Sequence, residues 1–136
     1  MAKRPTVPSA IMRELRAITR DLPEVAEEPA WVGTRWVIRK KNFAHVLNIA
    51  DGWPPAYAKA AGTDGPAIVL TFRSSGAELN ALANAGHPFF RPVWFDDIIG
   101  VVIDTETDWS EIRELVIESY CALAPKKLVA LVARPA

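Results

Sequence analysis

The segment DWSEIRELVIESY, residues 108–120, carries the clearest structural signal in this chain. Asp108 can accept hydrogen bonds from the free N–H groups of a first helical turn, and Glu111 can reach back in a capping-box arrangement. Both carboxylates would also sit at the positive end of the helix dipole. Small or apolar residues follow at spacings of three and four: Ile112, Leu115, Val116, Ser119 and Leu123. The pattern predicts an amphipathic helix that reaches about Leu123, with the Ser119 hydroxyl bonded to a backbone carbonyl one turn back.

Length and composition limit the classes of protein to consider. The chain has 136 residues, half of them hydrophobic, which suits one domain with a substantial core. Sixteen basic and sixteen acidic residues cancel, so the overall electric field attracts neither polyanions nor polycations. The single cysteine, Cys121, excludes an internal disulfide and a multi-cysteine metal cluster. No signal-peptide pattern and no apolar stretch of membrane-spanning length is visible, and we expect a cytoplasmic protein without membrane contact.

The rest of the chain alternates between helical and strand patterns. We expect residues 1–8 to form a flexible arm and residues 9–133 to form a single domain. A first helix is predicted from Ser9 to Leu22. Residues 51–66 hold three glycines and three prolines and predict a long loop. A second helix should begin at Ser75, which has the capping-box spacing to Glu78. Strands are predicted over residues 25–30, 36–39, 43–49, 67–73, 89–95 and 98–103.

These elements predict a fold class. A last apolar element over residues 126–132 reads as a short buried helix, with a strand as the alternative. The order is then α-β-β-β-β-α-β-β-α-α. Because the strands are contiguous and joined by short turns, the sheet should be mostly antiparallel. The expected architecture is therefore α+β, a single domain in which helices cover one face of the sheet.

Basic residues gather at one predicted hairpin, whose second strand should place Phe43, His45, Leu47 and Ile49 on one face. The bend of such a hairpin can lie against a phosphate backbone, and Trp36 beside it could stack on an unpaired base. Arginines on the outer face of the first helix could extend this surface. The alternative is a solvated turn that protects the sheet edge, with a tryptophan in the core. The candidate nucleic-acid-binding residues are Arg35, Arg39, Lys40, Lys41, Arg13, Arg16 and Arg20.

Other constellations favour binding over catalysis. Trp53 and Tyr57 in the long loop could contact a ligand or partner, or could pack as a small satellite core. The two histidines, His45 and His87, lack the spacing of a zinc site. Neither a serine nor Cys121 has the neighbours that activate a nucleophile. We therefore expect no catalytic residue, no metal and no cofactor.

Short motifs along most of the chain resemble the MmcQ/YjbR family of small bacterial proteins. The resemblance implies a compact α+β fold of YjbR type and a label of DNA-binding protein. The matching segments cover roughly residues 9–132 and are Glu24 to Pro29, Trp36-Val37-Ile38, Lys41-Asn42-Phe43-Ala44, Val69-Leu70-Thr71-Phe72, Pro92 with Trp94, Asp108-Trp109, Leu115, Ser119-Tyr120 and Lys126-Lys127-Leu128.

Two hypotheses about function follow. The first is a cytoplasmic, non-enzymatic protein of MmcQ/YjbR type that binds DNA weakly and without sequence preference through the basic hairpin. The second is a protein-interaction or chaperone-like module that uses the sheet face or the loop with Trp53 and Tyr57. An enzyme is the least supported reading.

Overall fold

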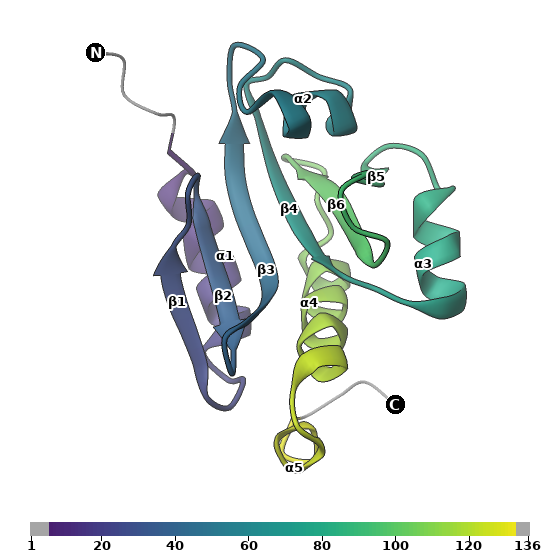
Figure 1. Cartoon of the computed structure of the whole chain (residues 1–136). Helices are drawn as coiled ribbons and strands as arrows, with labels where there is room; N and C mark the ends of the chain where they lie inside the picture. Colours follow the sequence, from purple (N-terminus) through teal and green to yellow (C-terminus); the bar gives the residue numbers. More distant parts are fainter. Residues whose placement is uncertain (1–5, 133–136) are drawn as a thin grey trace.

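A six-stranded sheet forms the centre of the computed structural model, which describes residues 6–132 (Figure 1). The strands lie in the order β1-β2-β3-β4-β6-β5, and each neighbouring pair is antiparallel. This confirms the predicted α+β class and the mostly antiparallel sheet. The strand bounds are β1 Val25–Pro29, β2 Thr34–Ile38, β3 Lys41–Ile49, β4 Ala67–Arg73, β5 Phe89–Phe90 and β6 Ile98–Ile103.

Two long helices cover one face of the sheet and enclose the main core. They are α1, Ser9–Thr19, and α4, Trp109–Leu123, and both lie behind the strands in Figure 1. The Asp108 carboxylate caps α4, since one of its oxygens accepts the N–H groups of Ser110 at 2.9 Å and Glu111 at 3.3 Å. The main core lies between these helices and the strands, and includes Leu15, Trp36, Phe43, Val46, Leu70, Phe72, Ile99, Ile112, Val116 and Tyr120.

The segment expected to be a loop, residues 51–66, contains a helix instead. Helix α2, Pro55–Ala61, has Pro55 at its first position and ends at Gly62, whose φ is 71°. Proline suits the start of a helix, and glycine suits the left-handed position after its end. Both residues therefore mark the ends of α2 rather than prevent the helix. Through Ala58, α2 packs in a second, smaller core with Val32, Leu47, Ile49 and Val69. The second face of the sheet is therefore partly covered as well.

Three other elements differ in detail from the prediction. Strand β5 contains only Phe89–Phe90, because the chain leaves the sheet before Pro92. The helix expected to begin at Ser75 is α3, Gly76–Ala83, and Ser75 makes no side-chain cap bond. The last element is the short helix α5, Lys126–Val129, so the alternative of a strand was wrong.

A bulge in the β2–β3 pair changes which side chains share a face. The register shifts between Trp36 and Val37, so that Trp36 faces Ala44 while Val37 faces Asn42. Phe43 consequently joins the main core, where its ring meets the ring of Tyr120 edge-on. His45 instead lies on the second face with Leu47 and Ile49, so the expectation that Phe43 shares their face was wrong.

The ends of the chain only partly fall within the described residues. Residues 6–8 of the expected arm precede α1, while residues 1–5 and residue 133 of the expected domain lie outside the described range. Helix α1 ends at Thr19, short of the predicted Leu22. No helix within residues 6–132 combines the length and apolarity needed to cross a membrane.

Candidate functional site

The arginines of the basic hairpin pair with carboxylates of the neighbouring strand. Arg35 lies directly opposite Glu28 in the β1–β2 register and its guanidinium is 2.9 Å from that carboxylate. Arg39 lies 2.8 Å from the carboxylate of Glu24, just before β1. Both pairs are exposed, so they contribute little to stability. They nevertheless cancel the positive charge that these arginines would offer to a phosphate backbone.

A third arginine of the predicted surface is neutralised by the same acidic strand. Arg16 of α1 holds Glu27 through its Nε and Nη2 atoms, with a shortest distance of 2.8 Å. The bond from Arg16 lowers the pKa of Glu27, and the bond from Arg39 lowers the pKa of Glu24. Both carboxylates therefore stay ionised and keep their arginines occupied at neutral pH.

Trp36 cannot serve as a stacking platform. Its side chain is 1% exposed and belongs to the main core, and its indole N–H donates to the Glu27 carboxylate at 3.1 Å. The core alternative for this tryptophan is confirmed, and the proposed stacking on a base is wrong.

Four exposed lysines remain at one end of the molecule. Lys40 and Lys41 lie at the β2–β3 turn, and Lys126 and Lys127 lie on α5. Lys127 helps to lower the pKa of the Glu24 carboxyl group, and Glu24 pairs with Arg39 at this turn. Figure 1 shows α5 and this turn at the same end of the ribbon. Within residues 6–132 these four lysines, here called the lysine end, form no ion pair.

The remaining predicted cations lie on α1. Arg13 and Arg20 are exposed, and neither has an ion-pair partner among the described residues. They line a shallow hollow along the helix together with Arg16. The predicted basic patch is thus divided. Arg16, Arg35 and Arg39 are paired with carboxylates, Arg13 and Arg20 are exposed on α1, and Lys40 and Lys41 belong to the lysine end.

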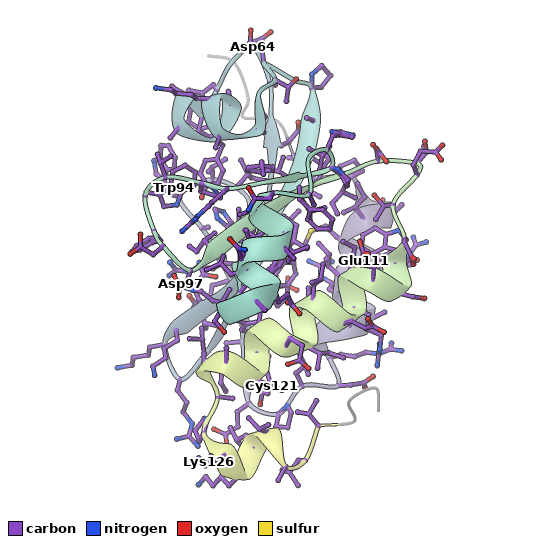
Figure 2. The ribbon with its side chains drawn as sticks, turned by 90° about the vertical axis from the view of Figure 1, so that its right-hand side faces the viewer. Asp64, Trp94, Asp97, Glu111, Cys121 and Lys126 are labelled. Atoms are coloured by element: carbon purple, nitrogen blue, oxygen red, sulfur yellow. The ribbon has the colours of Figure 1, made fainter. Side chains whose placement is uncertain are left out.

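A small pocket opens on the second face of the sheet, beside α2. Its volume is about 110 Å³. Figure 2 shows Trp94, one of its walls, on the same side of the ribbon as α2. The pocket combines aromatic walls with a few polar groups: it is lined by Asn42, Phe43, His45, Tyr57, Thr71, Phe72, Arg73, Trp94, Phe95 and Ile98.

His45 and Tyr57 form a hydrogen-bonded pair in this pocket. His45 Nε2 lies 2.5 Å from the Val32 carbonyl oxygen, which can only accept, so Nε2 carries the proton. The Tyr57 hydroxyl, 3.2 Å from His45 Nδ1, must then donate to that nitrogen. Burial lowers the pKa of His45 and raises the pKa of Tyr57, so both side chains are neutral at neutral pH. The pair fixes the tautomer of His45 and the orientation of Tyr57.

Arg73 supplies the positive charge of the pocket. Its Nη1 donates to the Asp97 carboxylate at 2.7 Å, and its Nε donates to the Asn42 carbonyl oxygen at 3.3 Å. The guanidinium carbon also lies 5.4 Å from the centre of the Phe95 ring, in a cation–π arrangement. The Arg73 side chain is only 23% exposed, and these three contacts hold it in place.

Further aromatic contacts involve residues of the pocket and of the second core. Tyr57 meets Trp94 edge-on at 4.9 Å between ring centres, and Trp31 packs against Trp53 at 5.3 Å. Phe95 is 54% exposed, and Val93 beside Trp94 is 92% exposed. The name aromatic face is used below for Trp31, Trp53, Tyr57, Val93, Trp94 and Phe95.

The sequence pointed to only part of this site. Tyr57 lines the pocket, whereas Trp53 packs partly buried against the second core. His45, Arg73 and Trp94 were not predicted as site residues. The only signal for two of them was weak: His45 lies between apolar residues within the predicted strand 43–49, and Arg73 ends the predicted strand 67–73.

The two possible nucleophiles, Ser119 and Cys121, are both at least partly buried. Ser119 is fully buried, and its hydroxyl donates to the Phe43 carbonyl oxygen at 2.6 Å and accepts the Arg73 N–H at 2.7 Å. The predicted bond to a carbonyl one turn back was wrong. Cys121 is partly buried and lines a second hollow of about 260 Å³. In residues 6–132 no three histidine, cysteine or acidic side chains are grouped as a metal site requires.

Comparison with known proteins agrees with this fold. The YjbR family model matches residues 20–122 of the chain. A crystal structure of a protein from Pseudomonas syringae, a structural genomics target, superposes with a TM-score of 0.62 at 12% sequence identity. The alignment covers 81% of this chain and 96% of that chain, and shows a shared fold. No curated protein matches. Because the family model spans well over half of the sequence, this chain belongs to the YjbR family.

Proposed function

We propose that this protein is a small, non-enzymatic interaction module that binds a segment of a partner protein on its aromatic face. One side chain of the partner would enter the pocket beside Tyr57, and neighbouring residues would cover Val93 and Phe95. The observation that carries the proposal is this combination of an aromatic pocket and exposed apolar side chains next to it. The single Cys121 fits a reducing, cytoplasmic setting, which is part of the proposal.

The size of the pocket favours an anchoring side chain over a whole metabolite. Sites for small molecules and cofactors are typically about 300–1,000 Å³. The pocket here, at about 110 Å³, has room for one side chain of moderate size. Protein interfaces commonly concentrate their binding energy in such central pockets, with aromatic and arginine side chains around them. Tyr57, Trp94 and Arg73 match that composition.

The exposed rim supports the same proposal. Val93 and Phe95 are 92% and 54% exposed, although valine and phenylalanine are usually buried. Phe95 itself lines the pocket, and Val93 precedes Trp94, another lining residue, in the chain. An adjoining cluster of this kind is more informative than a single exposed apolar residue elsewhere on a surface.

The polar groups of the pocket favour binding over catalysis. A general base needs a free lone pair that faces the substrate. Both ring nitrogens of His45 are already hydrogen-bonded, to the Val32 carbonyl oxygen and to the Tyr57 hydroxyl. Arg73 is held by an ion pair with Asp97, which is not among the lining residues. These contacts orient side chains for recognition.

The test uses a phage-displayed library of random peptides, panned against the wild-type protein. The dissociation constants of the selected peptides are then measured for Val93→Ser, Phe95→Ser and the control Leu131→Ser. Leu131 is also exposed, at 71%, but lies outside the aromatic face. We expect the two rim variants to weaken binding about tenfold or more, since each removes about 1.4 kcal/mol or more of apolar contact. The control should bind as the wild type does.

Two results would overturn this proposal. One is a library that yields no peptide for the wild-type protein, and the other is a set of peptides whose affinity is equal in all variants. Light scattering on the purified protein identifies the case in which the partner is a second copy of the chain. In that case Val93→Ser should shift the mass from dimer to monomer, while Leu131→Ser should not.

Nucleic-acid binding is a second candidate, supported by the lysine end. Lys40, Lys41, Lys126 and Lys127 gather there, and without an ion pair to any residue of 6–132 they are available to phosphates. About four phosphate contacts would give weak, strongly salt-dependent binding without sequence preference. This surface differs from the predicted one, because α5 takes the place of the paired arginines.

Fluorescence anisotropy with short single- and double-stranded DNA tests the second candidate. We expect binding at about 50 mM salt that weakens steeply by about 200 mM. The double variant Lys40→Glu with Lys126→Glu should abolish it, and Glu24→Gln should strengthen it by releasing Arg39. The matched control is Arg13→Glu with Arg20→Glu on α1. Equal effects of the two double variants, or no binding at about 50 mM salt, would remove this candidate.

A further inference from the structure

We infer that the occupant of the pocket carries a carboxylate next to an apolar side chain, and that Arg73 binds this carboxylate. The inference rests on the proposed function, because it names the chemistry that the pocket of the aromatic face selects. Such a carboxylate has two possible sources in a partner protein: the C-terminus of a chain, or an aspartate or glutamate beside an apolar residue.

The first reason is that several N–H groups of the Arg73 guanidinium have no acceptor among the described residues. A guanidinium has five N–H groups. Arg73 spends one on the Asn42 carbonyl oxygen and one on the Asp97 carboxylate. No described residue accepts from its Nη2 atom, and the side chain lines the pocket. A planar pair of oxygens is the acceptor that matches the remaining N–H groups.

The second reason is that Arg73 is the only charged side chain among the residues that line the pocket. Burial keeps its neighbours His45 and Tyr57 neutral at neutral pH. A cationic occupant would meet the guanidinium directly, because the partner carboxylate of Arg73, Asp97, is not among the lining residues. An anionic occupant would meet a positive charge that is only 23% exposed, where a charge-assisted hydrogen bond is stronger than in water.

The third reason is the way Asp97 holds Arg73. Among the described residues the Asp97 carboxylate accepts one side-chain hydrogen bond, at 2.7 Å from Arg73 Nη1, and the Asp97 side chain is 48% exposed. Figure 2 shows Asp97 at the surface, below Trp94. Asp97 can therefore share the guanidinium with an incoming carboxylate or turn into water. The Arg73–Asp97 pair keeps the arginine in position while the pocket is empty.

The aromatic walls determine what accompanies the carboxylate. Tyr57, Trp94 and Phe95 line the pocket together with Ile98. An apolar side chain placed against these rings loses contact with water, which is favourable by about 25 cal/mol per Å². Because the pocket holds about 110 Å³, the side chain is of the size of leucine or phenylalanine.

The test uses four small probes in place of the unidentified partner. N-acetyl-L-leucine and N-acetyl-L-phenylalanine carry the carboxylate, and N-acetyl-L-leucine amide lacks it. N-acetyl-leucyl-aspartic acid α-amide has only a side-chain carboxylate. Each is titrated into the ¹⁵N-labelled full chain, and the shifts of the Arg73 Nε–H and Trp94 indole N–H signals are followed by NMR. We expect the acids to bind about tenfold more tightly than the amide, as one charge-assisted contact provides. Equal binding of the aspartyl probe indicates that either source is accepted, and weaker binding indicates the C-terminus.

Two variants change the affinity for acids in opposite directions. Arg73→Gln should remove the preference for acid over amide. Asp97→Asn should increase the affinity for acids about threefold or more, because it releases an Arg73 N–H and removes a like charge. A merely structural Arg73–Asp97 pair predicts that Asp97→Asn leaves binding unchanged or weakens it. The control is Arg113→Gln on α4, an exposed arginine away from the pocket.

Each outcome decides the inference. It is overturned if acid and amide bind equally, if neither shifts the two signals, or if Asp97→Asn fails to raise acid affinity. If Arg73→Gln does not fold, the acid–amide comparison and Asp97→Asn still decide. Failure here leaves the proposed function open, since peptides selected by panning can still depend on Val93 and Phe95. Failure of that panning, by contrast, leaves the interaction proposal without support whatever the small probes do.

Discussion

At the residue scale, Gly33 shows how one position can constrain the site. It lies in the β1–β2 turn with a φ of 73°, a region that glycine enters without strain. A Cβ on Gly33 would collide with the Val46 carbonyl oxygen of the neighbouring strand. This close approach brings Val32 to His45, so the conformation of the turn also helps to form the pocket.

We therefore expect Gly33→Ala to lower the free energy of unfolding by about 3 kcal/mol or more, because the clash is with backbone. Gly62→Ala is the matched control: its φ is 71°, but no atom lies near the new Cβ. That variant should cost about 1 kcal/mol, the strain of the left-handed conformation alone. Urea denaturation measures both values, and equal losses would contradict the clash.

Ser119 makes a second residue-scale link, between α4 and two strands. Its hydroxyl serves both the Phe43 carbonyl and the Arg73 N–H, and the residue is fully buried. Ser119→Ala should lower the free energy of unfolding by about 2 kcal/mol, because both backbone groups lose their partner without access to water. Ser110→Ala, at an exposed position of the same helix, should cost less than about 0.5 kcal/mol. A loss at Ser119 as small as the one at Ser110 would show that the two groups find other partners.

At the element scale, the two helices with a predicted capping box behave differently. Asp108 caps α4 with two side-chain hydrogen bonds, whereas Ser75 makes no such bond at α3. Local spacing indicated a cap at both places. The difference arises because Gly76, with a φ of 60°, changes the backbone direction at the start of α3.

This difference can be measured by paired substitutions. Asp108→Ala should lower the free energy of unfolding by about 1 kcal/mol, the usual loss of a side-chain cap. Ser75→Ala should change it by less than about 0.5 kcal/mol, since no cap bond is lost. Thermal denaturation of the two variants compares them directly. A larger loss at Ser75 than at Asp108 would contradict the observed caps.

At the scale of the whole molecule, buried and paired ionisable groups link stability to pH. Burial lowers the pKa of His45 below its ordinary value of 6.5, so the unfolded chain binds this proton more readily than the folded chain. The stability contributed by neutral His45 is therefore complete above about pH 6.5 and is lost as the pH falls further. Ion pairing lowers the pKa of Glu24 and Glu27 below 4.5, so their contribution is lost only at more acidic pH.

We accordingly expect the free energy of unfolding to fall as the pH is lowered from about 7 to about 5. His45→Gln, which keeps a donor for Val32, should remove most of this decrease and leave the loss below about pH 4.5. Urea denaturation at a series of pH values measures both curves. If the slope between about pH 7 and 5 is the same in wild type and variant, His45 is not the group responsible.

Elements with local signals could be predicted from the sequence. The cap at Asp108 and the apolar stripe through Ile112 and Val116 predicted α4, and short turns between β-rich segments predicted an antiparallel sheet. Local signals predicted a loop at residues 51–66, which was wrong. A short helix begins at Pro55 and ends before Gly62, and packing through Ala58 stabilises it.

Which charges remain available, and where the pocket lies, depend on contacts between segments that are distant in the sequence. Glu24, Glu27 and Glu28 cancel three arginines because β1 pairs with β2 and packs beside α1, and spacing along the chain does not report such contacts. The pocket brings together β3, α2, β4 and the residues after β5, which are far apart in sequence. Electrostatic and packing energies depend on distance in space. Arg35 and Arg39 therefore form a basic hairpin in the sequence pattern, but in the fold nearby carboxylates neutralise them.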